Sequence, residues 1–168
     1  MTQTPFYDQH VSSGAKIVDF HGWEMPLQYS GIIDEHKNLR SNVGLFDVSH
    51  MGRFKITGTS AENCLQNLLT NDVTKIGDLQ AIYSPMCSES GGILDDVIAY
   101  RINEDDFLMV VNSSNIEKDF AWVVSHSQDA HVENITDQMA LLALQGPASE
   151  EVLKAAGLEL SELKRFHL

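Results

Sequence analysis

The order of short apolar segments between residues 53 and 135 constrains the fold more than any other feature of this sequence. Five of these segments have the residue pattern of β-strands: residues 54–57, 82–87, 93–102, 107–111 and 131–135. Two others have apolar residues at helical spacing: one that Ser60 can cap, and one from Asn115 to about Ser127. The order β-α-β-β-β-α-β, joined by short turns, predicts an α+β fold with helices on one face of an antiparallel sheet.

The segments on either side have weaker patterns. Before residue 53 we expect a short helix over residues 5–11, a strand over 15–20 and a looser helix over 31–43. His21, Gly22, Trp23 and Pro26 predict a break in regular structure between that strand and that helix. After residue 136 the pattern predicts a strand over residues 139–144 and a helix over 148–156.

Composition limits the function classes. The chain has 168 residues, a hydrophobic content of 43% and a formal net charge of -13. This content is ordinary for a globular protein, and an acidic surface repels phosphate backbones, so we expect no nucleic-acid partner. The sequence has no apolar run of the roughly 20 residues that span a bilayer, and its start is neither basic nor apolar. We therefore expect no membrane partner and a cytoplasmic location.

Neither the cysteines nor the histidines have the spacing of a metal site. Cys64 and Cys87 are far apart and are most simply interpreted as reduced, structural thiols. The histidines show no HxH, HxxxH or HExxH pattern, so we expect no metal.

Two adjacent carboxylates, Asp95 and Asp96, stand inside the apolar strand at residues 93–102. Aspartate is depleted in strands, and neighbouring side chains of a strand point to opposite faces. Asp96 is therefore expected on one face with Leu94, Ile98 and Tyr100, and Asp95 on the other. A carboxylate among aliphatic neighbours should have a raised pKa and favour a hydrogen-donating ligand. A solvated edge or an internal cap is an equally good interpretation of the pattern.

The next strand ends at Asn112, which shares a face with Leu108 and Val110. Its side-chain amide could bind a planar edge that carries a donor and an acceptor, or it could simply cap the following helix. Ser49 and His50 are adjacent, but neighbouring residues of an extended segment point apart and no GxSxG elbow surrounds Ser49. Hydrolase chemistry is therefore not expected.

Four motifs, in this order, resemble those of the T-protein of the glycine cleavage system, an aminomethyltransferase family. They are VDFHGWEMPLQY at residues 18–29, LFDVSHM at 45–51, GGILDD at 91–96 and LALQGP at 142–147. The resemblance extends over nearly the whole chain. It implies transfer of an aminomethyl group from the lipoyl arm of H-protein to tetrahydrofolate, with release of ammonia.

The resemblance also implies roles for individual residues. Asp96 would be the catalytic acid/base beside the pterin, orienting the folate and managing the proton on the attacking nitrogen. The residues that match the lining of the folate pocket are Met51, Tyr83, Tyr100, Val110 and Asn112. The strand parity independently places Asp96 with Tyr100, and Val110 with Asn112.

Members of this family are longer proteins of three domains around a folate channel. The resemblance therefore implies that residues 1–51 and 137–168 form an incomplete first domain, and that residues 52–136 form an inserted, ferredoxin-like α+β second domain. The alternatives are a truncated, non-catalytic folate-binding or interaction module and, more weakly, a related folate-dependent demethylase.

Overall fold

The structure is a computed structural model that describes residues 1–158 and 164–168. The chain divides into two compact units. Unit 1 holds Met1–His50 and the described residues that follow Gln138, up to residue 158; unit 2 holds Met51–Gln138 and residues 164–168. Part of the predicted first-domain segment 137–168, namely residues 159–163, lies outside the described residues. No helix in the described part of the chain is long and apolar enough to cross a membrane.

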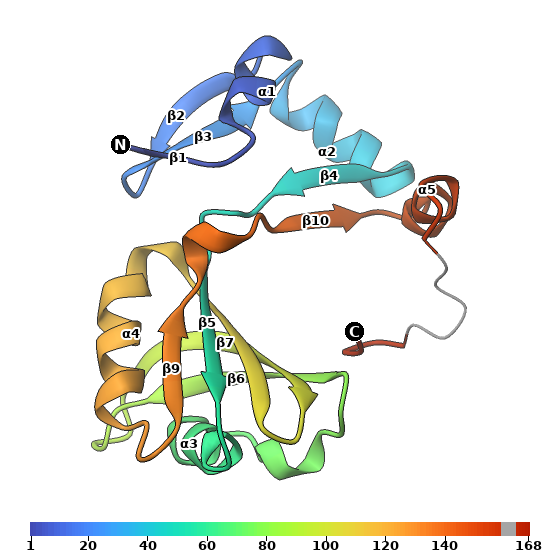
Figure 1. Ribbon diagram of the computed structural model, residues 1–168. Helices are drawn as coiled ribbons and strands as arrows, with labels where there is room; N and C mark the ends of the chain where they lie inside the picture. Colours follow the sequence, from blue (N-terminus) through green and yellow to red (C-terminus); the bar gives the residue numbers. More distant parts are fainter. Residues whose placement is uncertain (159–163) are drawn as a thin grey trace. The chain divides into compact units, whose positions relative to one another are not determined.

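Unit 2 is built on an antiparallel sheet, which has five strands in the described residues, in the order β6-β7-β8-β5-β9 (Figure 1). The strands are β5 (Gly52–Thr57), β6 (Gln80–Cys87), β7 (Ile93–Asn103), β8 (Asp106–Val111) and β9 (His131–Asn134). All five were predicted from the sequence within a few residues of their bounds. At the β6 edge, Gln80 forms an isolated antiparallel bridge with His167.

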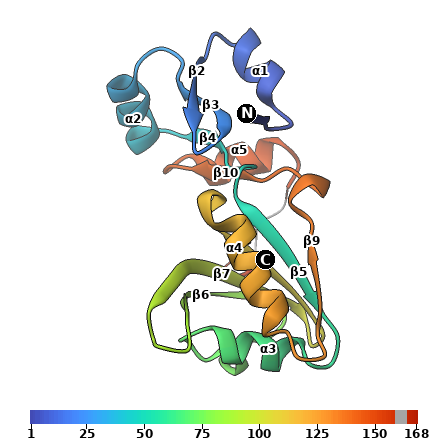
Figure 2. The same ribbon diagram turned by 90° about the vertical axis from the view of Figure 1, so that its left-hand side faces the viewer.

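Two α-helices accompany this sheet, α3 (Ala61–Leu68) and α4 (Ile116–Ser125) (Figure 2). The short 3-10 helices are η1 (Val73–Lys75), η2 (Ser113–Asn115) and η3 (Thr136–Gln138). The apolar side of α3 is buried, as its helical spacing predicts, and so is Val123 of α4. Ser60 precedes α3 but makes no side-chain cap hydrogen bond, so that part of the prediction is wrong.

The core of unit 2 lies between the helices and one face of the sheet. Every second side chain of these strands points into this core, among them those of Phe54, Ile56, Val97, Ala99, Met109 and Val111. Burying such side chains stabilises a fold by about 1.5–3 kcal/mol each. The alternate residues of each strand point to the other face of the sheet. On that face Tyr83 of β6, Ile98 of β7 and Val110 of β8 are register partners.

Unit 1 contains two small sheets in the described residues. The strands β1 (Thr2–Gln3), β3 (Trp23–Gln28) and β2 (Lys16–Phe20) form one sheet in that order, and β4 (Gly44–Asp47) pairs with β10 (Leu142–Gln145). The helices are α1 (Tyr7–Ser12), α2 (Ile32–Ser41) and α5 (Ser149–Ala155). The predicted α+β fold is confirmed, and the sheet of unit 2 is antiparallel as predicted, but the three-stranded sheet of unit 1 is mixed because β1 pairs with β3 in parallel.

Three strands of unit 1 differ from the sequence prediction, and one of them, β1, was not predicted. The segment expected to be irregular contains β3, and Pro26 lies inside it. In the described residues β3 meets β1 only at Trp23 and Glu24, so Pro26 has a strand neighbour on one side alone. A register irregularity next to Ile17, the partner of Pro26, further accommodates the missing N–H. The strand β4 was not predicted, because its partner β10 lies far away in sequence.

Candidate functional site

The two carboxylates of β7 point to opposite faces of the unit 2 sheet, as the strand parity predicts. Asp95 is 6% exposed and lies on the face that carries Val97 and Ala99. Asp96 is exposed on the opposite face. Its neighbours Leu94 and Ile98 are only partly buried and leave the carboxylate accessible, so Asp96 is solvated, although β7 is not an edge strand.

Hydrogen bonds from two neighbouring strands orient the Asp96 carboxylate. The phenol of Tyr83 on β6 donates to Oδ2 at 2.7 Å. The side-chain amide nitrogen of Asn112, directly after β8, lies 3.3 Å from Oδ1 and 3.2 Å from the backbone oxygen of Asp96. The hydrogen bond to Asp96 is the main cause of a raised pKa of Tyr83. Tyr83 is therefore a neutral donor, and Asp96 presents an oriented carboxylate to solvent.

The remaining residues matched to the folate pocket lie on or next to the same face. Val110 stands opposite Ile98 in the register of β7 and β8, and Tyr100 lies two residues further along β7. Burial raises the pKa of the Tyr100 phenol, which is therefore neutral at physiological pH. Met51 directly precedes β5 and is half-buried; its backbone oxygen accepts a hydrogen bond from the guanidinium of Arg53.

Asn112 does not cap the following helix through its side chain, so that alternative is wrong. It occupies the N-cap position of η2 without a side-chain cap hydrogen bond. Its backbone N–H instead donates to Oδ2 of Asp95 at 3.0 Å, and its amide nitrogen donates to Oδ1 of Asp95 at 2.8 Å. Asn112 thereby connects the buried carboxylate of Asp95 to the exposed carboxylate of Asp96.

Two further polar residues, Asn115 and Asp119, belong to this arrangement and were missed by the sequence analysis. The amide of Asn115 donates to Oδ1 of Asp95 at 2.9 Å. Asp119 on α4 is completely buried, and its carboxyl group is hydrogen-bonded to that of Asp95. A signal was present in the sequence: Asp119 follows Ile116 by three residues and precedes Val123 by four, so it lies on the apolar side of the helix.

The two buried carboxyl groups have pKa values shifted in opposite directions. Burial, the hydrogen bond to Asp95 and the charge of Asp95 together raise the pKa of Asp119 to about 7. Burial also opposes ionisation of Asp95, but the hydrogen bonds from Asp119, Asn112 and Asn115 outweigh it and lower the pKa of Asp95. Two close carboxyl groups that share one proton have this electrostatic pattern. Asp95 therefore ionises first, and Asp119 keeps its proton up to about neutral pH.

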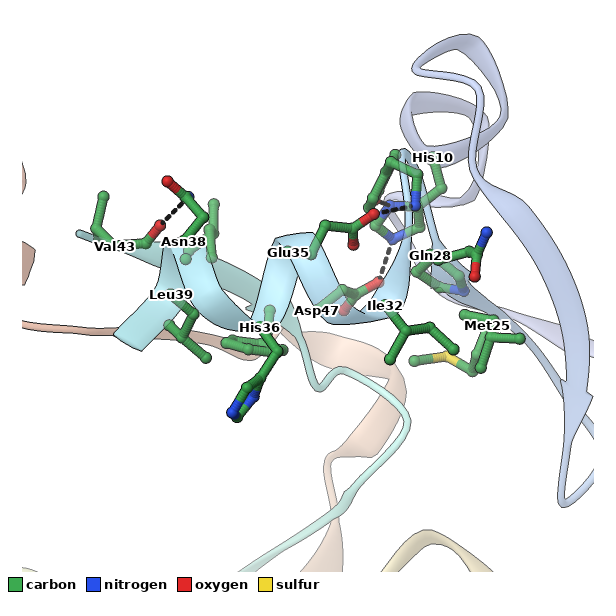
Figure 3. Close-up of a pocket in the computed structure, with 16 residues that line it drawn as sticks. His10, Met25, Gln28, Ile32, Glu35, His36, Asn38, Leu39, Val43 and Asp47 are labelled. Carbon is green, nitrogen blue, oxygen red and sulfur yellow. Dashed lines mark hydrogen bonds and ion pairs between the residues drawn. The ribbon is translucent and has the colours of Figure 1, made fainter. Parts of the chain in front are cut away.

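Unit 1 contains a separate pocket of about 440 Å³, shown in Figure 3. At its wall the imidazole of His10 lies 2.9 Å from a carboxylate oxygen of Asp47 and 2.7 Å from the hydroxyl of Tyr29 (Figure 3). Glu35 accepts the backbone N–H groups of residues 29–31, which lower its pKa. These polar groups are satisfied by one another, and the folate residues matched by sequence belong to unit 2. We interpret the His10 contacts as a structural link between α1, β3 and β4.

Ser49 has a structural role in unit 1. Its hydroxyl donates to the backbone oxygen of Leu141 at 3.2 Å and accepts from the N–H of the same residue at 3.0 Å. The ring of His50 packs edge-on against Phe20.

The fold and the site define a class: an α+β protein with an exposed, oriented carboxylate on the sheet face opposite its helices. A sequence model of the GCVT N-terminal domain matches residues 6–167. The chain therefore belongs to the glycine cleavage T-protein family, as its motifs indicate.

Named relatives agree with this assignment. An aminomethyltransferase of Desulfitobacterium hafniense is 48% identical over 169 residues, which cover 99% of this chain and 46% of that protein. One of Thermotoga maritima is 51% identical over 156 residues, which cover 92% and 43%. The crystal structure of glycine cleavage system aminomethyltransferase T from Bartonella henselae superimposes with a TM-score of 0.93 at 37% identity, over 99% of this chain and 46% of that one. The chain thus spans about half the length of the relatives it matches.

Proposed function

We propose that this chain supplies the acid/base group and part of the folate pocket of an aminomethyltransferase of the glycine cleavage system. The reaction moves the aminomethyl carbon from the lipoyl arm of H-protein to tetrahydrofolate and releases ammonia. The observation that carries the proposal is the exposed carboxylate of Asp96, oriented by Tyr83 and Asn112 on the sheet face opposite the helices. The family membership and the names of the relatives support it.

The chemistry requires a group that orients the folate and accepts or returns the proton of its attacking nitrogen. Asp96 is suited to this role because it is accessible and because two hydrogen bonds hold its carboxylate in one orientation. Tyr100 and Val110, on the same sheet face, would contact the flat pterin ring. Met51 would complete this surface from its position before β5.

We further propose that unit 2 is the second domain, inserted into a first domain to which unit 1 belongs. Support comes from the division of the described residues into these two units. In the order β5-α3-β6-β7-β8-α4-β9, the strands β8 and β9 lie on either side of β5, run parallel to each other and are joined through α4, which supports a relation to ferredoxin-like folds. The cytoplasmic location remains a prediction from the sequence.

The alternative is a truncated, non-catalytic folate-binding or interaction module. Such a module would bind tetrahydrofolate but would not release ammonia from aminomethylated H-protein. A folate-dependent demethylase would form methylenetetrahydrofolate from a methylated amine without H-protein.

The test is steady-state formation of methylenetetrahydrofolate by the complete protein that carries this sequence. Asp96→Asn keeps the shape of the side chain and removes its basicity, so the rate should fall about 100-fold or more. Glu104→Gln, an exposed residue of the β7–β8 turn, is the matched control and should leave the rate unchanged. An Asp96→Asn enzyme as fast as this control would refute the role of Asp96. Binding of tetrahydrofolate without release of ammonia from aminomethylated H-protein would instead support the non-catalytic module.

A further inference from the structure

The starting observation is the number of donors that meet at one buried carboxylate. Asp95 accepts the backbone N–H of Asn112 and the side-chain amides of Asn112 and Asn115, all within 3.0 Å. The carboxyl group of Asp119 makes a fourth contact. A carboxylate has about four lone-pair positions. The hydrogen-bonding capacity of Asp95 is therefore filled.

Asp119 can make its contact only as a proton donor. Asp119 is completely buried, and neither of its carboxyl oxygens receives a hydrogen bond from a donor group in residues 1–158 and 164–168. The ammonium of Lys118 forms an ion pair with Oδ1 at 3.3 Å and also donates to the backbone oxygen of Leu94; it lowers the pKa of Asp119, but burial and Asp95 outweigh it. A carboxylic acid that donates to Asp95 satisfies this site, whereas a second buried carboxylate would repel the first.

The orientation of the Asn112 amide follows from this arrangement. An ionised Asp95 can only accept, so the –NH₂ group of Asn112 must face it, and the same nitrogen also approaches Asp96. Among the described residues, no donor contacts the amide oxygen of Asn112. Asn112 therefore offers a ligand an acceptor, and not the donor–acceptor pair that the sequence suggests.

We propose that Asp119 and Asp95 are positioning residues, which hold the Asn112 amide so that its oxygen accepts an N–H group of the ligand. This inference rests on the proposed function, in which that ligand is the pterin ring of tetrahydrofolate. The pair of Asp119 and Asp95 makes the proposed folate pocket selective for a ring edge that carries N–H donors. An acceptor on the ring would face another acceptor, the amide oxygen of Asn112. It also assigns a role to Asp95, which the sequence analysis places on the face away from the ligand.

Three variants of the complete protein test the positioning role. Asp119→Asn retains an N–H donor for Asp95, so the dissociation constant for tetrahydrofolate should stay within about threefold of the unaltered protein. Asp119→Leu removes the donor at similar volume and should weaken binding about tenfold. Asp95→Asn places an amide among amide donors and should weaken tetrahydrofolate binding at least as much as Asp119→Leu. Glu117→Leu, the same kind of substitution on the exposed side of α4, should leave binding unchanged.

A second readout needs no ligand and separates failure of this inference from failure of the proposed function. The side-chain amide resonances of Asn112, assigned with Asn112→Ala, should show slow hydrogen exchange in the unaltered protein and in Asp119→Asn. In Asp119→Leu the exchange should be at least about tenfold faster, because the orientation of the amide is less restricted. Unchanged amide exchange in Asp119→Leu would overturn the positioning role. Absent tetrahydrofolate binding by the unaltered protein, with the amide effects intact, would refute the proposed ligand alone.

Discussion

The phenol of Tyr83 donates a 2.7 Å hydrogen bond to Asp96 across two antiparallel strands of unit 2. Pro85 is the register partner of Asp96, so Tyr83 stands two residues from it on the same face of the sheet. Long side chains reach such diagonal neighbours in a sheet. The strand register thus brings a donor and an exposed carboxylate together without any contribution from the core.

Tyr83→Phe should reduce catalytic efficiency without loss of stability. The side chain is 49% exposed, so its hydroxyl contributes little to the core. Losing one hydrogen bond to a charged group costs about 1.5 kcal/mol or more, which corresponds to about tenfold in kcat/KM. Asn112 still contacts Asp96, so the effect should be smaller than that of Asp96→Asn. Steady-state kinetics check this, and Tyr7→Phe in unit 1 is the control.

The stability of unit 2 should depend on pH through Asp119. Its pKa is raised to about 7 in the folded state, mainly by burial, and is near 3.8 when unfolded. Between these values the folded state holds a proton that the unfolded state has lost, so this group makes stability fall as pH rises. The slope is up to about 1.4 kcal/mol per pH unit. Asp119→Asn removes this contribution.

The melting temperature of Asp119→Asn, relative to that of the unaltered protein, should therefore increase between about pH 4.5 and about pH 7, the range between the unfolded and folded pKa values of Asp119. Differential scanning calorimetry on both proteins at several pH values measures it. A difference that does not change with pH would show that Asp119 is not protonated in the folded state.

Asp47→Asn should destabilise unit 1. The Asp47 side chain is 1% exposed and lies 2.9 Å from Nε2 of His10. Burial opposes its ionisation, but hydrogen bonds from His10 and Ser49 outweigh this and lower the pKa of Asp47. Replacing a buried, charged hydrogen-bond partner costs about 1.5–3 kcal/mol.

This loss should be largest near neutral pH. A group whose pKa is lowered on folding stabilises the protein above its unfolded value, near 3.8, and the contribution disappears as pH falls through the folded value. Denaturant titrations at neutral and acidic pH compare the two proteins. A destabilisation that grows in acid would contradict the assignment of Asp47 as an ionised residue.

Gly52→Ala should destabilise unit 2 by overpacking. A Cβ atom at this position would lie 2.5 Å from Cγ2 of Val111 and 2.8 Å from Cγ1 of Ile116. Both contacts are with branched side chains, one at the end of β8 and one at the start of α4, so relief requires a shift costing about 1–3 kcal/mol. Gly77→Ala is the matched control, because the nearest atom to its Cβ would be 3.8 Å away. Thermal unfolding should separate the two, and equal melting temperatures would contradict the predicted strain.

Local sequence patterns determine most of unit 2. The helical spacing of Ala61, Cys64, Leu65 and Leu68 predicts the buried side of α3, and the alternation of β7 separates Asp95 from Asp96. Both are properties of neighbouring residues, because the periods of helix and strand are set within a few positions. The sequence motifs also identify the family without any structural information.

Contacts between distant residues could be learned only from the tertiary structure. The pairing of β4 with β10, the link from His10 to Asp47 and the pair formed by Asp95 and Asp119 each join segments that no local pattern relates. The same is true of the exposure of Asp96, since strand parity assigns a face but not what covers it. Burial and proton sharing depend on the packing of α4 against β7, and that packing decides which carboxyl group is charged.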